Sequence, residues 1–340
     1  MKIIVKGILL FLTFITLSCS SEVDNDSLPI IDNTPIEKEV IEGLDFVGAT
    51  LVEDTLDKSF SACFVNEDKM YATAEDETYM FEFATNTWSL LATDVDTPDS
   101  DFELGINFIR NNKWHRLIRK GLFVYDFETA NWERVKLLTN TLGIFSNEGF
   151  YVEEDDAVYF VDQTNGKENI FIYDLLSNEL SIHSTYVNDG GWYPISTNAF
   201  TKNDTNYIVS LSGWESMKIS KFNDDFTTFE TINNFGTENH LDDSVACQYG
   251  DYFIFGLGGV PTGDGEGNII SDPSTLNFFY YNILNNTFGT MSTPFYESRR
   301  SAQLVTYNNE FYLVGGYTIK NGKSEITTKV EKLEFKIVEK

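Results

Sequence analysis

Short hydrophobic runs alternate with polar turns along this chain, and the pattern repeats. The segment 81–88, FEFATNTW, aligns without gaps on 125–132, YDFETANW. Six such copies start at residues 81, 125, 173, 222, 281 and 333, the last of them truncated, so the spacing is 44 to 59 residues. In each complete copy a strand ends, side chains such as Asp, Asn and Thr supply a turn, and a second strand follows. The repeats therefore predict a series of β-hairpins.

Two further apolar runs precede each hairpin, as in 301–307, SAQLVTY, and 310–316, EFYLVGG. Each period therefore contains four short strands. A four-stranded unit of about 50 residues, repeated six times, is typical of a β-propeller. We predict an all-β, six-bladed β-propeller over residues 44–340. The alternative, a seven-bladed ring, needs about 50 further residues.

The two ends of the predicted ring complement each other. The sixth copy reaches Lys340 without an outer strand, while residues 44–52, LDFVGATLV, precede the first complete unit and read as an unpartnered strand. We expect this N-terminal strand to complete the last blade, because doing so removes an exposed sheet edge.

The last copy resembles the kelch family. It has Arg299-Arg300-Ser301, then 311–317, FYLVGGY, then 330–335, VEKLEF. The Gly-Gly pair recurs as Gly258-Gly259 and in part as Ser212-Gly213. The resemblance implies a propeller in which the connections between second and third strands, with the loops leading into each blade, surround one mouth of a central channel. It also implies that ligands bind at that mouth.

Eight residues are predicted to lie at this mouth. By the resemblance, Tyr317 and Trp214 follow the glycine positions. Loops leading into blades contribute Trp192, Tyr193, Asp242, Asp243, Arg299 and Arg300. Aromatic side chains beside Arg and Asp suit sugar rings or an acidic ligand, through stacking and bidentate hydrogen bonds. The alternative is that Trp192 and Trp214 pack between blades.

The N-terminus predicts export and lipidation. Lys2 and Lys6 precede an apolar run, 7–17, that is about half the ~20 residues needed to span a bilayer. The segment ends in Cys19, and it resembles the lipobox of bacterial lipoproteins. That resemblance implies a signal peptide over 1–18 and lipid attachment at Cys19. A plain secretory signal is the alternative.

Residues 19–43 are polar and lack periodicity, as expected of a flexible acidic tether. The acidic run after Cys19 resembles the surface-export signal of lipoproteins in Bacteroidetes-type bacteria. We therefore expect a lipid-anchored outer-membrane protein displayed on the cell surface.

Charge excludes several partners. The chain has 53 Asp and Glu against 24 Lys and Arg, a formal charge of −29. Residues 1–18 hold two lysines and no acid, so the remainder carries −31. Such a surface repels nucleic acid and anionic membranes, which leaves the lipid as the expected membrane contact. Because the chain is 42% hydrophobic, with 28 Phe and 17 Tyr, this charge belongs to a folded domain rather than to a disordered one.

The sequence offers little support for metal or catalytic chemistry. His115, His183 and His240 fall in three different predicted blades, and metal ligands must converge on one point. The loop 260–272 carries acidic or amide side chains at the alternate spacing of a calcium site, but it lacks the terminal glutamate; a solvated loop is the alternative. Apart from Cys19, two cysteines remain, Cys63 and Cys247, which we expect to be buried thiols. We expect no cofactor and no metal.

These observations favour a non-catalytic binding module, a monomeric domain whose channel mouth takes a glycan, peptide or protein ligand. The alternative is an enzyme. Some six-bladed kelch proteins of bacterial envelopes are sialic-acid mutarotases, and this resemblance would give Arg299 or Arg300 the role of holding the sugar carboxylate. No acid or base residue is assigned for that reaction.

Overall fold

The computed structural model describes residues 42–339, apart from 57, 59, 61, 94–104, 139–148, 165–166, 187–193, 213–215, 237–240, 242, 260–261, 264–268 and 272–274. Every regular element within this part is a β-strand. Accordingly, no described helix could cross a membrane. The predicted residues Cys19, Trp192, Tyr193, Trp214 and Asp242, together with His240 and most of the loop 260–272, lie outside the described residues.

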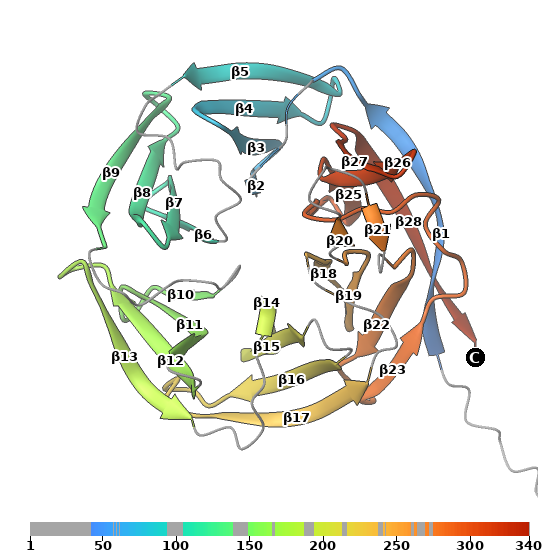
Figure 1. Cartoon of the computed structure of the whole chain (residues 1–340). Helices are drawn as coiled ribbons and strands as arrows, with labels where there is room; N and C mark the ends of the chain where they lie inside the picture. The colour runs from blue at the N-terminus through green and yellow to red at the C-terminus, as the bar shows by residue number, and fades with distance from the viewer. Residues whose placement is uncertain are drawn as a thin grey trace, which may run out of the picture. The chain divides into compact units, whose positions relative to one another are not determined.

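Six four-stranded antiparallel sheets form the blades of a ring, as Figure 1 shows. Blades one to three are β2(Ala62–Asn66), β3(Lys69–Ala74), β4(Glu77–Glu82), β5(Thr87–Thr93); β6(Gly105–Arg110), β7(Lys113–Ile118), β8(Gly121–Asp126), β9(Asn131–Leu137); and β10(Phe150–Val152), β11(Ala157–Thr164), β12(Lys167–Asp174), β13(Glu179–Tyr186). Blades four to six are β14(Pro194–Lys202), β15(Thr205–Ser212), β16(Ser216–Phe222), β17(Phe229–Gly236); β18(Val245–Tyr249), β19(Tyr252–Gly256), β22(Phe278–Asn282), β23(Thr287–Thr290); and β24(Gln303–Tyr307), β25(Glu310–Val314), β28(Val330–Glu339), β1(Glu42–Glu53). The six-bladed propeller predicted from the repeats is confirmed.

Two small hairpins are inserted between the second and third strands of the last two blades. They are β20(Thr262–Gly263) with β21(Ile269–Ser271) in blade five, and β26(Tyr317–Lys320) with β27(Lys323–Ile326) in blade six. In an antiparallel blade, the end of the second strand and the start of the third lie at the same end as the start of the inner strand. Both hairpins therefore lie at the end of the ring where the inner strands begin, which we call the mouth.

The repeated hairpin turns are built by side chains, as the sequence predicts. In blade two, Asp126 Oδ1 accepts hydrogen bonds from the backbone N–H groups of Glu128, at 2.9 Å, and Thr129, at 3.3 Å. Asp174 in blade three and Asn282 in blade five make equivalent pairs of bonds. The copies also place a residue with φ near 55° five positions after the last aromatic residue of the third strand, at Ala130, Asn178 and Asn286 among others. Asparagine suits this left-handed conformation better than alanine does. The sequence repeat therefore reflects mainly the residues that form these hairpin turns.

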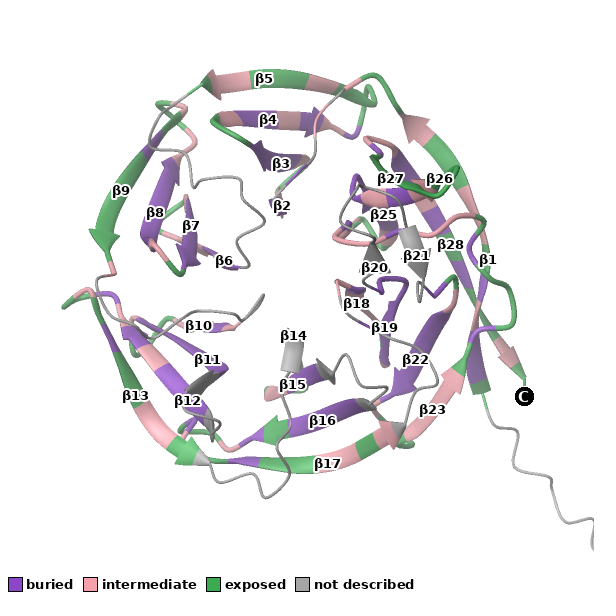
Figure 2. Ribbon diagram, viewed as in Figure 1, coloured by how far each residue is buried: buried purple, intermediate pink, exposed green. Residues whose placement is uncertain are grey.

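Six hydrophobic clusters hold the blades together, and each lies mainly between two neighbouring blades. Figure 2 shows the second and third strands mostly buried, while the outer strands β5, β9, β13 and β17 are largely exposed. The cluster between blades one and two is built around Trp114, which is fully buried and lies 4.9 Å from the ring of Trp132. This packing explains the high aromatic content.

Polar contacts supplement the clusters between blades. Arg110 of blade two donates to both carboxylate oxygens of Asp156 in blade three, with Nε at 2.6 Å from Oδ1. Ser184 Oγ donates to the carbonyl of Thr227 in the next blade at 2.6 Å. The blades are thus connected by specific hydrogen bonds as well as by apolar packing.

The N-terminal strand closes the ring. β1 pairs antiparallel with β28 from Glu42↔Glu339 to Glu53↔Val330, and it forms the outer strand of blade six. Phe46 of β1 is 3% exposed and contacts the rings of Phe278, Phe295 and Phe335 at 5.2, 5.9 and 5.7 Å. The predicted closure is confirmed.

The histidine of the second strand in blade two is buried. His115 is 5% exposed, its ring stacks on Phe108 with centroids 5.1 Å apart, and its Nδ1 lies 3.1 Å from the carbonyl oxygen of Lys113. Burial lowers the pKa of His115 to about 4 from an ordinary value of 6.5. Neutral His115 therefore belongs to the core.

This shift predicts a pH-dependent loss of stability. Because the folded-state pKa is the lower one, the unfolded state binds more protons between pH 6.5 and 4. The stability that neutral His115 contributes is complete above about pH 6.5. It is lost as the pH falls toward 4, by about 3 kcal/mol. Urea unfolding of the wild type and His115→Phe across this range measures the effect. Parallel pH profiles for the two proteins would contradict it.

Cys63 and Cys247 are buried thiols, as expected. No group of three or more His, Cys, Asp or Glu side chains able to hold a metal occurs within the described ranges.

Candidate functional site

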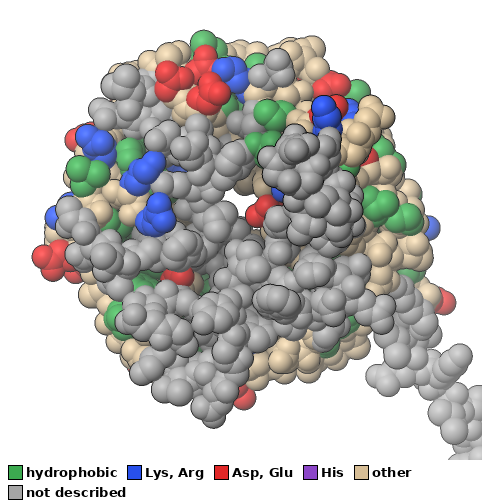
Figure 3. All heavy atoms as spheres, viewed as in Figure 1, with side chains coloured by type: hydrophobic (Ala, Val, Ile, Leu, Met, Phe, Trp, Pro, Cys, Tyr) green, Lys and Arg blue, Asp and Glu red, His purple; other side chains and the backbone are tan. Residues whose placement is uncertain are grey.

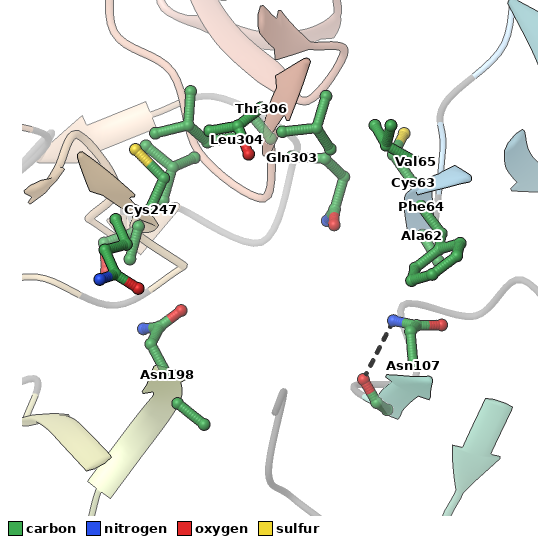
Figure 4. A pocket seen from close by; sticks show the side chains of 18 of the residues that line it. Ala62, Cys63, Phe64, Val65, Asn107, Asn198, Cys247, Gln303, Leu304 and Thr306 are labelled. Carbon is green, nitrogen blue, oxygen red and sulfur yellow. Dashed lines mark hydrogen bonds between the residues drawn. The ribbon is translucent and has the colours of Figure 1, made fainter. Parts of the chain in front are cut away.

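The inner strands of all six blades surround a central cavity of about 600 Å³. Every blade contributes to the wall of this cavity. Examples, one for each blade in order, are Ala62, Asn107, Gly149, Asn198, Val245 and Gln303. Figure 3 shows the opening at the centre of the face seen there, and Figure 4 shows the side chains that line it. Several of these residues begin their strands, as Gly105, Val245 and Gln303 do, so the cavity extends to the mouth. The ring closure therefore creates a polar compartment at the place where the sequence predicts ligand binding.

Among the buried polar atoms of the described cavity wall that lack a hydrogen-bond partner, two belong to uncharged side chains. Asn198 of β14 is 6% exposed, and its Nδ2 makes no hydrogen bond. Ser244, directly before β18, is 9% exposed, and its Oγ is also without a partner. Buried polar groups are nearly always satisfied, and an exception calls for a bound molecule or a functional cause. Both atoms line the same cavity, so one ligand could satisfy both.

Two further amide side chains point into the cavity. Asn107 of β6 is held in place, because its Oδ1 accepts a hydrogen bond from Trp114 Nε1 at 3.0 Å and its Nδ2 donates to the Gly105 carbonyl at 3.4 Å. Gln303 extends from the opposite side of the cavity (Figure 4). Its amide makes no hydrogen bond with the described residues and is therefore available to a ligand.

The described cavity wall contains one cation and one carboxylate, Arg116 of β7 and Asp243. The Arg116 side chain is 1% exposed, and its Nη1 lies 3.5 Å from Thr73 Oγ1. Burial raises the pKa of the nearby Cys63 thiol, and the positive charge of Arg116 opposes that rise. Cys63 is therefore a neutral, unreactive thiol at physiological pH.

Arg299, predicted for the mouth, lies inside blade six. It is fully buried; its Nη2 is 2.5 Å from both Glu297 Oε1 and Glu331 Oε2, and its Nη1 donates to the Gly315 carbonyl at 3.0 Å. Although burial opposes ionisation, Lys329 and Arg299 hold the pKa of Glu297 below its ordinary value. The charge of Arg299 is thus neutralised within the fold, and we assign it a structural role.

Arg300 and Tyr317 are brought together at the mouth. Their backbones form an isolated bridge, with Arg300 N to Tyr317 O at 3.0 Å and Tyr317 N to Arg300 O at 2.8 Å. The Arg300 guanidinium lies 5.3 Å from the Tyr317 ring centroid, and its Nη2 donates to Ser324 Oγ at 2.8 Å. These two of the predicted residues therefore share one surface beside hairpin β26–β27.

Sequence reasoning missed Arg116 and the amides of the cavity. One available pattern was the segment 113–118, KWHRLI, in which an arginine interrupts a strand that is otherwise mostly apolar. Nothing in the sequence marks Asn198 or Gln303, because their importance comes from positions that the ring brings together.

Comparisons with known proteins agree with the fold. No family model matches the chain, and no curated protein matches it. Among solved structures, that of YjhT matches with a TM-score of 0.59 at 13% sequence identity, covering 84% of this chain and 100% of YjhT. At this identity the likeness bears on the fold alone. The protein is a six-bladed β-propeller with a polar central cavity.

Proposed function

We propose that this protein is a binding module of the cell envelope whose ligand enters at the mouth and occupies the central cavity. The observation that supports it is the pair of unpartnered buried atoms, Asn198 Nδ2 and Ser244 Oγ, in the wall of one cavity. Burying a polar group without a partner destabilises the fold. A ligand that hydrogen-bonds to both atoms removes this destabilisation. Ligands with suitably placed polar groups are therefore bound in preference to others.

A non-catalytic role fits the chemistry of the described wall. Amide and hydroxyl groups, as in Asn107, Asn198 and Ser244, hydrogen-bond to ligands but do not act as general acids or bases near neutral pH. Arg300 and Tyr317 extend the binding surface at the mouth, where the guanidinium and the ring are stacked.

Lipid anchoring at Cys19 and display on the cell surface are part of this proposal. They are supported by the charged, apolar and cysteine-terminated pattern of residues 1–19 and the acidic residues after it. Mass spectrometry of the N-terminal peptide from the mature protein tests the anchor: a peptide that starts at Cys19 and carries acyl chains supports it, and an unmodified Cys19 refutes it.

Blocking the cavity should abolish ligand binding. In Gln303→Trp an indole replaces a half-buried amide that points into the cavity, whereas Ser89→Trp adds the same group to the exposed outer strand β5. We expect glycan arrays and peptide libraries to yield a ligand that both wild type and Ser89→Trp retain. Gln303→Trp should weaken its binding at least tenfold. A ligand that binds all three proteins equally would refute a cavity site.

The mutarotase alternative is favoured by one observation, the presence of both Arg116 and Asp243 in the cavity wall. A cation can hold a sugar carboxylate, and a carboxylate can transfer the proton that ring opening requires. NMR of freshly dissolved sialic acid separates the two functions. Anomerisation at the buffer rate excludes the enzyme, and acceleration that Asp243→Asn removes would replace the binding proposal.

A further inference from the structure

We infer that the cavity takes a neutral saccharide, whose hydroxyl groups are held by three amides, Asn107, Asn198 and Gln303, which we call the amide triad. This inference rests on the proposed function and specifies its ligand. It assigns recognition to residues deep in the ring, apart from the surface formed by Arg300 and Tyr317.

The amide triad comes from alternate blades. Asn107 lies in blade two, Asn198 in blade four and Gln303 in blade six. In a six-bladed ring these positions approach the central axis from three directions, and Figure 4 shows the three side chains directed into one space. A pyranose carries hydroxyl groups around its rim, each a donor and an acceptor. An amide also offers both, so three amides around the axis match the rim of a sugar ring.

Two members of the amide triad have unmet hydrogen-bonding capacity. Asn198 Nδ2 is buried without a partner, and the Gln303 amide has none among the described residues. Asn107 is oriented by Trp114 and so presents its remaining N–H in a fixed direction. Water can satisfy such groups one at a time, but a polyol satisfies several with one molecule and without immobilising several waters.

An aromatic ring borders the same space. Phe64 of β2 is half-buried, lines the cavity and is stacked on Trp114, with centroids 5.8 Å apart and planes inclined by 16°. Figure 4 shows its side chain near Asn107. An aromatic ring held in place beside hydrogen-bonding amides suits the apolar C–H face of a sugar. Trp114 thus supports both Phe64 and Asn107.

Charge and size favour a neutral small molecule. Arg116 and Asp243 are the charged residues of the described wall, and their formal charges cancel. The cavity volume of about 600 Å³ falls within the ~300–1,000 Å³ of small-molecule sites. A short neutral saccharide satisfies both conditions, whereas a folded protein partner could contact only the mouth.

The test compares two Asn→Leu variants in blade four. Asn198→Leu removes the buried amide, and Asn234→Leu changes an exposed residue of the outer strand β17. Saturation-transfer NMR and calorimetry would use methyl glycosides of glucose, galactose, mannose and N-acetylglucosamine, their disaccharides, and sialic and glucuronic acids. We expect at least one neutral sugar to bind the wild type and Asn234→Leu equally. Asn198→Leu should bind it at least tenfold more weakly.

Thermal unfolding provides a second measurement. Because leucine replaces an unpartnered buried amide, Asn198→Leu should melt no lower than the wild type while losing the sugar. Gln303→Leu, at a half-buried position, repeats the binding test should Asn198→Leu fail to fold. Equal sugar affinity in these variants and the wild type, or binding of the acidic sugars alone, would refute the saccharide inference.

The two proposals fail in different ways. A peptide or acidic ligand that Gln303→Trp excludes would leave the binding function standing and overturn the neutral saccharide. A neutral sugar bound with full affinity by Gln303→Trp would place its site outside the cavity and refute both.

Discussion

Arg299→Met is expected to lower the free energy of unfolding by about 3–5 kcal/mol, because removing one partner of a buried ion pair leaves the other charge uncompensated. Glu331 is 1% exposed and makes its 2.5 Å contact with Arg299 inside blade six. The Tyr296 hydroxyl also hydrogen-bonds Glu331, but it does not neutralise the charge. The variant additionally leaves the Gly315 carbonyl without the hydrogen bond from Arg299 Nη1.

Urea unfolding measures this change, and the neighbouring arginine provides the control. Arg300→Met removes a guanidinium that is partly exposed and bonded to Ser324, so it should cost less than about 1 kcal/mol. Adding Glu331→Gln to Arg299→Met should recover part of the loss, since a neutral amide replaces the buried carboxylate. Similar costs for Arg299→Met and Arg300→Met would contradict the buried-network interpretation.

The contrast between these arginines shows where sequence reasoning reached its limit. Arg299 and Arg300 are adjacent, and both fit the basic position of the kelch pattern. Successive side chains in extended backbone point to opposite sides. One of the pair therefore enters the blade and the other faces the mouth. The sequence gives no register here because this segment forms only a single bridge, Arg300↔Tyr317, rather than a strand.

The fold could be predicted from the sequence because the residues that specify it are close together in the chain and recur in each blade. Asp126, Asp174 and Asn282 each use a side-chain oxygen to form the same turn, so their chemistry is visible in a short window of sequence. The amide triad has no such local pattern. Asn107 and Gln303 are 196 residues apart in the sequence, and it is the closed ring of blades that brings them to one cavity. Their convergence on one cavity could not be predicted without the structure.

Deleting the closing strand should produce the largest loss of stability. A chain that starts at Asp54 lacks β1, exposes the edge of β28 and removes Phe46 from its contacts with Phe278, Phe295 and Phe335. Loss of one buried Phe side chain costs about 3–5 kcal/mol. Removing Leu44 as well, which is fully buried, together with the paired backbone should approach the ~5–15 kcal/mol that stabilises a whole domain.

We therefore expect the chain starting at Asp54 to lose its cooperative thermal transition and to associate through β28, as followed by circular dichroism and size-exclusion chromatography. A chain starting at Ile41 retains β1 and is the matched control. A synthetic peptide of residues 42–53 should restore the transition, since its antiparallel register with β28 is specified from Glu42↔Glu339 to Glu53↔Val330. Melting of the shortened chain at the temperature of the control would show that blade six is stable with three strands. It would also mean that contacts between blades, rather than β1, hold the cavity closed.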